Sequence, residues 1–186
     1  MDLREMLQVF IINLLPFLSI VYVVAGIQYL RHKQSGRINF FGLFMFACAI
    51  YTLGYYLEIQ TYDPGLMPWI RGFEFFGVAA LPGFGIVYIA EYALGHTISR
   101  KFSLWLGVLS GVVWLTYVTD PLHHLFYSSI NIFHGHIGTI VQTVKGPLYY
   151  LLLVYYCCFV LLAVFFLANA IFKIPPRNQA KTRKYC

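Results

Sequence analysis

The sequence predicts an all-α integral membrane protein with five transmembrane helices and a short β-hairpin. Of its 186 residues, 60% are hydrophobic and only 11% are charged, whereas about a quarter of the residues in soluble domains are charged. This composition excludes a disordered chain and a nucleic-acid-binding protein, and it argues against a water-soluble globule. The second observation is that the hydrophobic residues fall in five long stretches without charge, which is typical of membrane-spanning helices.

The charge-free stretches predict where the membrane-spanning helices lie. Four of them contain at least 18 residues without charge, close to the roughly 20 residues that a helix needs to cross about 30 Å of hydrocarbon. The third has only 16 such residues, between Glu74 and Glu91, so one of these glutamates is expected inside the boundary region. The predicted spans are residues 7–30, 38–59, 68–93, 102–119 and 146–172. Together they predict a single transmembrane domain over residues 1–186.

The basic residues predict the orientation of the chain. Ten of the thirteen Lys and Arg residues lie in the first loop, the third loop and the C-terminal tail. The exceptions are Arg4, Arg71 and Lys145, which lie on the other side together with most of the acidic residues. Because cytoplasmic loops are enriched in Lys and Arg, the N-terminus is predicted outside and the C-terminus inside.

The third span is interrupted by Pro82 and Gly83. Proline removes a backbone donor and bends a helix, and glycine permits bending or close packing. Two interpretations stay open here: a packing kink, or a hinge that moves during function.

The second outer loop, residues 120–145, is too long for a tight turn. It begins with an aromatic segment typical of the membrane interface. Residues 129–133 and 139–144 then flank a stretch that contains Gly135 and Gly138, and the alternating β-branched residues of the second segment favour a strand. We therefore expect a β-hairpin lying as a lid over the outer end of the helices.

Charged residues beside the bilayer core are the candidate ligand-binding residues. Glu58 ends the second span and shares a helical face with Tyr55, while Arg71 and Glu74 lie three residues apart at the start of the third. They are either a clamp that joins two helices or the polar floor of an outward-facing pocket, and both can hold at once. With His124 from the outer loop, these five residues form the predicted ligand site. Ionisable residues inside a membrane mark functional sites by default.

The same loop also contains the histidines that suggest a metal site. They are His123, His124, His134 and His136. Adjacent histidines point apart in most backbones, and no cysteine in the loop supports them as ligands. The sequence contains no motif for nucleophilic, phosphate-binding or zinc-dependent catalysis, so no cofactor, metal or catalytic residue is predicted, and the chain is not expected to be an enzyme.

Several segments together resemble the N-terminal seven-transmembrane sensor region of bacterial histidine kinases. The resemblance runs from residue 10 to the end of the chain. The matching segments are Tyr51-x-x-Gly54-Tyr55-x-x-Glu58, Pro68-Trp69-x-x-Gly72-Phe73-Glu74-Phe75-Phe76-Gly77, Pro82 with Tyr92, Thr119 to Tyr127, Gly146-Pro147-x-Tyr149, and Arg177-x-Gln179.

This resemblance implies the input module of a two-component receptor in the bacterial inner membrane. Such a module binds a small or lipophilic ligand near the outer face, is expected to form a homodimer, and passes its signal to a cytoplasmic effector. Only five spans precede Cys186, so the family's sixth and seventh helices and the effector domain are expected to be absent from this chain.

Two other classes of function predict different sequence features. A transporter or channel subunit predicts a midplane ionisable site or a pair of broken helices in internal repeats, whereas here the polar residues lie at the outer edge, a single span is broken and no repeat is present. A membrane-embedded enzyme would depend on the histidine loop. The transporter is the main alternative to the sensor.

Overall fold

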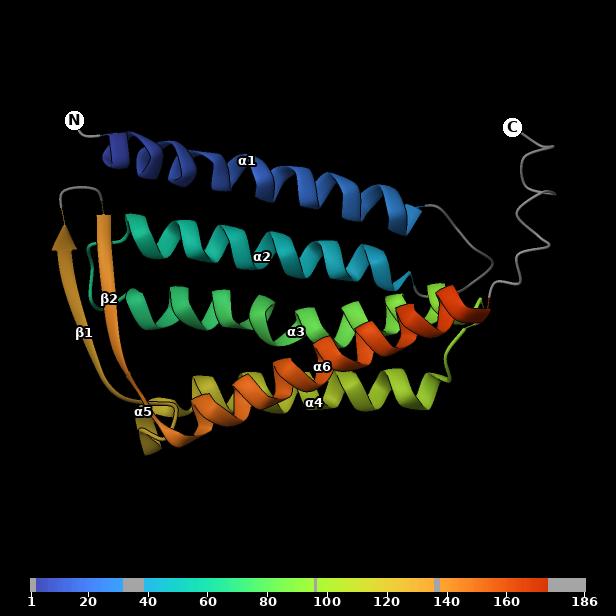
Figure 1. Cartoon of the computed structure of the whole chain (residues 1–186). Helices are drawn as coiled ribbons and strands as arrows, with labels where there is room; N and C mark the ends of the chain where they lie inside the picture. The colour runs from blue at the N-terminus through green and yellow to red at the C-terminus, as the bar shows by residue number, and fades with distance from the viewer. Residues whose placement is uncertain (1–2, 32–38, 96, 136–137, 174–186) are drawn as a thin grey trace.

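The computed structural model describes residues 3–31, 39–95, 97–135 and 138–173. Within these ranges the chain forms six helices and one two-stranded sheet (Figure 1). The helices are α1 (Leu3–Arg31), α2 (Phe40–Gln60), α3 (Met67–Leu94), α4 (Arg100–Val118), α5 (Asp120–His123) and α6 (Pro147–Lys173), and the strands are β1 (Tyr127–Gly135) and β2 (Gly138–Lys145).

The predicted architecture is confirmed. Five helices, namely α1, α2, α3, α4 and α6, are long and apolar enough to cross a membrane, and the hairpin lies between α5 and α6. The predicted orientation stays a prediction. Much of the charge that supports it, including Lys33, Arg37 and the basic tail, lies outside the described residues, as does His136.

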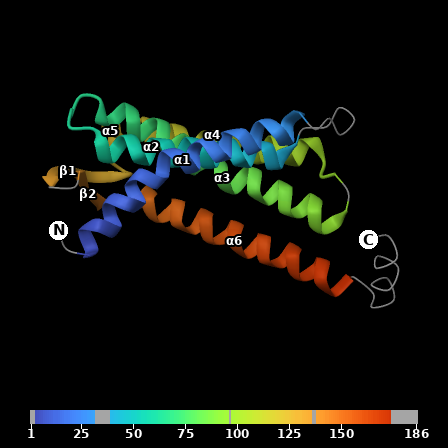
Figure 2. The ribbon, with the colours of Figure 1, turned by 90° about the horizontal axis from the view of Figure 1, so that it is seen from above.

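The long helices run side by side, with α3 in the centre. In Figure 1, α1, α2 and α3 follow one another across the molecule, and α4 and α6 lie beyond α3. α3 packs against α2, α4 and α6, while α1 packs against α2. The hairpin, α5 and the α2–α3 connection gather at one end, and the view from above agrees (Figure 2). This end is called the hairpin end below.

The core follows from the central place of α3. Half of the most apolar stretch of α3 is buried, and Val87 and Ala90 are almost completely so. The helices at the periphery expose large apolar side chains, among them Phe17 on α1 and Trp105 on α4. Such faces are suited to lipid, since hydrocarbon tails are as apolar as these side chains.

Small residues let α2 and α3 approach closely. A Cβ atom on Gly54 would lie 2.6 Å from the Cα of Glu74, and one on Gly77 would lie 2.7 Å from the backbone nitrogen of Tyr51. Membrane helices pack closely where glycine removes the side chain. As a result, the halves of α2 and α3 toward the hairpin end lie directly against each other.

The hairpin is antiparallel, with Ser129 opposite Val144 and Phe133 opposite Ile140. A β-bulge lies between Tyr127 and Ser129. Gly146 then closes the loop by donating its backbone N–H to the Phe126 carbonyl at 2.8 Å, and a Cβ atom on Gly146 would overlap the Leu125 carbonyl.

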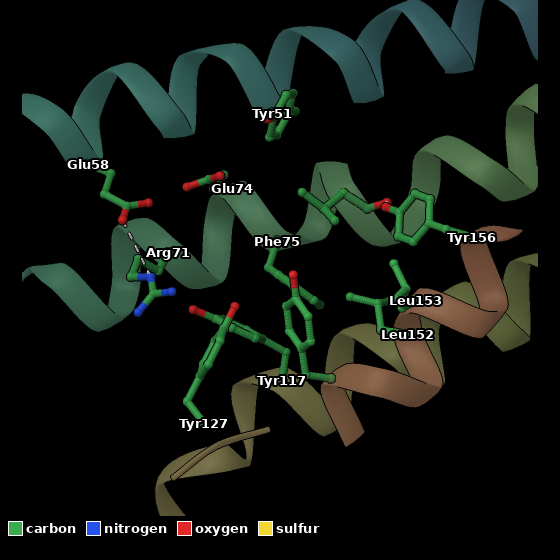
Figure 3. A pocket seen from close by; sticks show the side chains of 12 residues that line it. Tyr51, Glu58, Arg71, Glu74, Phe75, Tyr117, Tyr127, Leu152, Leu153 and Tyr156 are labelled. Carbon is green, nitrogen blue, oxygen red and sulfur yellow. Dashed lines mark hydrogen bonds and ion pairs between the residues drawn. The ribbon is translucent and has the colours of Figure 1, made fainter. Parts of the chain in front are cut away.

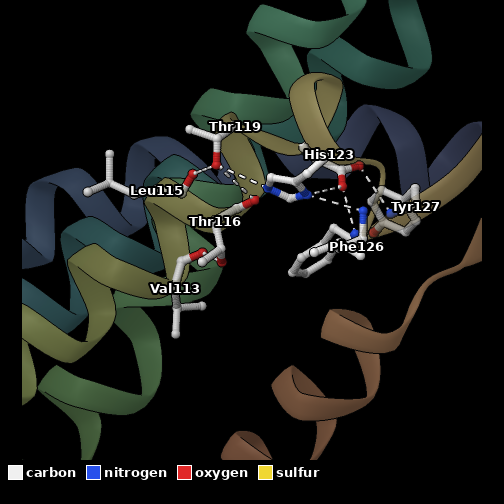
Figure 4. Close-up of polar contacts among 9 residues, drawn as sticks. Val113, Leu115, Thr116, Thr119, His123, Phe126 and Tyr127 are labelled. Atoms are coloured by element: carbon white, nitrogen blue, oxygen red, sulfur yellow. Dashed lines mark hydrogen bonds and ion pairs between the residues drawn. The ribbon is translucent and has the colours of Figure 1, made fainter.

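α5 holds the start of the hairpin. The buried carboxylate of Asp120 accepts hydrogen bonds from the backbone N–H groups of Phe126, at 2.6 Å, and Tyr127, at 3.0 Å (Figure 4). His123 lies 3.6 Å from the same carboxylate and contacts the Thr119 hydroxyl at 3.2 Å. Asp120 therefore fixes the point at which β1 leaves the helices.

Pro82 does not end α3, which continues from Met67 to Leu94. Gly83 is buried against α4, where a Cβ atom would lie 2.7 Å from the Ser110 hydroxyl. The close contact explains a glycine at this position through packing, and the predicted hinge at Pro82 and Gly83 stays a prediction.

Candidate functional site

A cavity of about 300 Å³ lies toward the hairpin end of the molecule, where α2, α3, α4, α6 and β1 meet (Figure 3). Its walls combine three ionisable groups with aromatic and aliphatic side chains. The lining residues are Tyr51, Glu58, Arg71, Glu74, Phe75, Val78, Tyr117, Tyr127, Tyr149, Leu152, Leu153 and Tyr156.

Helical periodicity explains why α3 and α6 supply most of the lining. On α3 the lining residues are Arg71, Glu74, Phe75 and Val78, and on α6 they are Tyr149, Leu152, Leu153 and Tyr156. Both sets follow the spacing i, i+3, i+4, i+7, which forms a single stripe along a helix. The two stripes face the same space.

Glu58 and Arg71 form an ion pair between α2 and α3. The Arg71 Nε lies 3.7 Å from the Glu58 Oε1, and the two side chains are only 11% and 14% exposed, respectively. The guanidinium also lies over the ring of Tyr127, with its central carbon 5.0 Å from the ring centre. One cation thus joins α2, α3 and β1 at the cavity.

The same guanidinium keeps an unused donor. Arg71 Nη1 is buried, and no hydrogen-bond partner for it occurs among the described residues. Buried polar groups in proteins are nearly always hydrogen-bonded. Figure 3 shows the hydroxyl groups of Tyr117 and Tyr127 in the same part of the cavity as Arg71. Each hydroxyl has a proton to donate, so this part of the cavity is rich in donors.

Glu74 is the second acidic group of the cavity. Its carboxyl group lies beside that of Glu58, between α2 and α3 (Figure 3). Two carboxyl groups next to one guanidinium leave an excess of negative charge, which in a low-dielectric site requires a bound proton or a cation.

Tyr127 closes the cavity from the hairpin. Burial raises the pKa of its hydroxyl above the ordinary value, and the positive charge of Arg71 opposes that shift. The hydroxyl is therefore protonated at neutral pH and can donate a hydrogen bond. Its position depends on Asp120, which binds the Tyr127 backbone N–H.

The structure brings together three of the five predicted ligand residues, Glu58, Arg71 and Glu74. Tyr55 does not line the cavity: its side chain is 43% exposed, and its ring stacks on that of Tyr51, which does. His124 is exposed and follows α5 with a φ of 52°.

Sequence reasoning missed most of the aromatic wall. Tyr117, Tyr127 and Tyr149 lie near span ends, where an aromatic belt explains tyrosines without any site. The signal that could have found Tyr149 is its spacing from Leu152, Leu153 and Tyr156, which matches the stripe on α3. Tyr156 also donates a hydrogen bond from its hydroxyl to the Val78 carbonyl, which ties α6 to α3.

Comparison with known proteins now assigns the chain to a family. The model for the N-terminal 7TM region of histidine kinase matches residues 10–183. The chain belongs to this family. The comparisons with curated proteins and with solved structures give no match.

This membership confirms the resemblance found in the sequence. The protein is a membrane sensor region of the histidine kinase type, and the matched residues do not include a kinase domain. Its helices make it a multi-pass membrane protein, in contact with lipid.

Proposed function

We propose that the single domain of residues 1–186 is the signal-sensing input module of a two-component receptor in the bacterial inner membrane. It binds a small ligand in the cavity at the hairpin end. The observation that carries this proposal is the cavity itself, which collects Glu58, Arg71 and Glu74 beneath the start of the hairpin. In the predicted orientation this end faces the outside, so a ligand arrives there without crossing the membrane.

Signal transfer follows from the helices that form the cavity. α6 lines it with residues of its first three turns and then runs to the opposite end of the bundle (Figure 1). α3 does the same and passes through the candidate hinge at Pro82 and Gly83. A ligand that contacts α3 and α6 more favourably in one packing arrangement than in another shifts the population toward that arrangement. The ends of α3 and α6 away from the hairpin report the shift to the effector.

The proposal is tested in a kinase that carries this sensor region, in membrane vesicles from its source cells. Replacing both acids, by Glu58→Gln and Glu74→Gln, is expected to change autophosphorylation or its response to the native medium at least fivefold. The matched control is Glu91→Gln, the same change at the other end of α3, where Glu91 Oε1 accepts from the Ile98 N–H at 3.2 Å and a glutamine oxygen can do the same.

A second pair of variants probes the cavity without changing charge. Val78→Phe fills the cavity and is likewise expected to change autophosphorylation or its response to the native medium at least fivefold. Val112→Phe adds the same volume on an exposed face of α4 and is expected to have no effect. Unchanged output in both the double glutamine variant and Val78→Phe, at normal abundance in the membrane, would refute the cavity as the sensing site.

A further inference from the structure

The charges that line the cavity do not balance. Glu58 and Glu74 contribute two carboxyl groups, and Arg71 contributes the one guanidinium. Lys145 lies nearby with its Nζ 4.6 Å from the centre of the Tyr149 ring, but its side chain is exposed, and water and salt screen an exposed charge. Inside the cavity the excess is therefore one negative charge. Without a ligand, a proton held between the hydrogen-bonded carboxyl groups of Glu58 and Glu74 compensates it, and a ligand with one positive charge can replace that proton.

The unused donor of Arg71 adds a second requirement. Nη1 is buried without a partner in the described part of the chain, while Nε of the same guanidinium faces Glu58. The neighbouring hydroxyls of Tyr117 and Tyr127 supply further donors. An oxygen acceptor on the ligand satisfies these donors. A carboxylate would restore the excess negative charge, so a neutral carbonyl oxygen fits better.

The two side chains that set these requirements are neighbours, so the ligand is expected to be compact. Arg71 and Glu74 lie three residues apart on one face of α3, and side chains with this spacing are neighbours, about 5–6 Å apart at Cβ. A small ligand with its positive group and its carbonyl oxygen a few bonds apart can therefore reach both side chains.

The rest of the wall is aromatic and aliphatic. Tyrosine rings from α2, α4, β1 and α6 surround the ionisable groups, and Phe75 and Leu152 complete the apolar surface. Tyrosine faces attract cations and pack against other rings. A cavity of about 300 Å³ lies at the small end of the usual range of ligand sites, roughly 300–1,000 Å³.

We propose that the ligand of the sensor cavity is a small organic cation, a protonated amine next to a neutral carbonyl group on an aromatic or branched apolar body, as in an amino-acid amide. Glu74, with Glu58 beside it, binds the ammonium group, Arg71 Nη1 donates to the carbonyl oxygen, and the tyrosine rings enclose the body. This inference rests on the proposed sensor function, because it assigns the chemistry of the same cavity.

The test compares four related compounds against the purified chain in lipid nanodiscs, with binding measured by calorimetry. Phenylalanine amide has both the amine and the neutral carbonyl. Phenylalanine adds a carboxylate, N-acetylphenylalanine amide removes the positive charge, and 2-phenylethylamine removes the carbonyl. The amide is expected to bind at least tenfold more tightly than each of the other three.

Single variants connect the preference to the named groups. Glu74→Gln is expected to weaken binding of phenylalanine amide at least tenfold, while the affinity of N-acetylphenylalanine amide changes less than twofold, which also shows that the cavity still folds. Arg71→Gln is expected to bring phenylalanine amide and 2-phenylethylamine to the same affinity. Glu91→Gln serves as the control and is expected to bind like the wild type.

Equal binding of phenylalanine amide and N-acetylphenylalanine amide would overturn the requirement for a positive charge. Equal binding of phenylalanine amide and 2-phenylethylamine would overturn the requirement for a carbonyl oxygen. Absence of binding by all four compounds at millimolar concentration would overturn the whole ligand class. None of these results touches the proposed function, which is decided separately by kinase output in the double glutamine and Val78→Phe variants.

Discussion

Asp120 offers the sharpest test of how the hairpin is held over the cavity. Its carboxylate accepts two backbone hydrogen bonds, from Phe126 and Tyr127, while its side chain is only 8% exposed. In Asp120→Asn one acceptor becomes an NH₂ donor, so one of these two N–H groups is left buried without an acceptor. Losing a hydrogen bond to a charged group costs about 1.5–3 kcal/mol. At about 2 kcal/mol, local opening of the segment becomes about thirtyfold more frequent.

Hydrogen–deuterium exchange of the chain in nanodiscs measures this opening directly. In Asp120→Asn the amides of Phe126 and Tyr127 are expected to exchange about thirtyfold faster, and phenylalanine amide is expected to bind more weakly because Tyr127 leaves the cavity wall. The control is Asp63→Asn. Asp63 binds the Gly65 N–H at 2.8 Å in an exposed turn, where water replaces a lost bond, so exchange at residues 126–127 should not change.

Two results would refute this reasoning. Exchange at residues 126 and 127 within threefold of the wild type would show that Asp120 does not hold the hairpin. A general acceleration that includes α3 would show that the whole bundle, rather than the start of β1, depends on this carboxylate.

The remaining predictions concern helix packing and orientation. Gly54→Ala is expected to lower stability by about 1–3 kcal/mol, because the new Cβ would lie 2.6 Å from Glu74. Gly107→Ala meets no atom within 4 Å and is expected to raise stability by about 0.5–1 kcal/mol. Thermal unfolding in nanodiscs measures both, and a stabilised Gly54→Ala protein would contradict the close packing of α2 and α3. In a chain without native cysteines, Ser129→Cys is expected to react with a membrane-impermeant maleimide on intact cells, and Lys101→Cys only after permeabilisation. The reverse pattern would overturn the predicted orientation.

The sequence alone determined the number and approximate position of the membrane helices. Inside hydrocarbon every backbone N–H and C=O must be hydrogen-bonded within the protein. A long apolar run without charge meets this requirement on its own by forming a helix. The hairpin was predictable for a related reason. Alternating β-branched residues after the two glycines of residues 135–138 favour paired strands.

Part of the site was also predictable. Glu58, Arg71 and Glu74 are costly to place near a bilayer, and Arg71 and Glu74 share a helical face whatever the fold. Their participation in one cluster could be expected from the sequence. Whether the cluster is only a clamp or also lines a cavity stayed open in the sequence, because this depends on how Gly54 and Gly77 bring α2 against α3.

The tertiary structure decided the rest. Lipid-facing and protein-facing surfaces of membrane helices are equally apolar, so hydrophobicity does not reveal which helices are neighbours. Only the fold shows that Tyr117, Tyr127 and Tyr149 surround a common space, although they come from α4, β1 and α6. In the sequence, nothing distinguishes Asp120 from the other acidic residues near the membrane interface. Only the path of the chain after α5 brings the backbone N–H groups of Phe126 and Tyr127 to its carboxylate. Contacts between residues distant in the sequence depend on how the helices pack, whereas each helix depends on its own backbone hydrogen bonds.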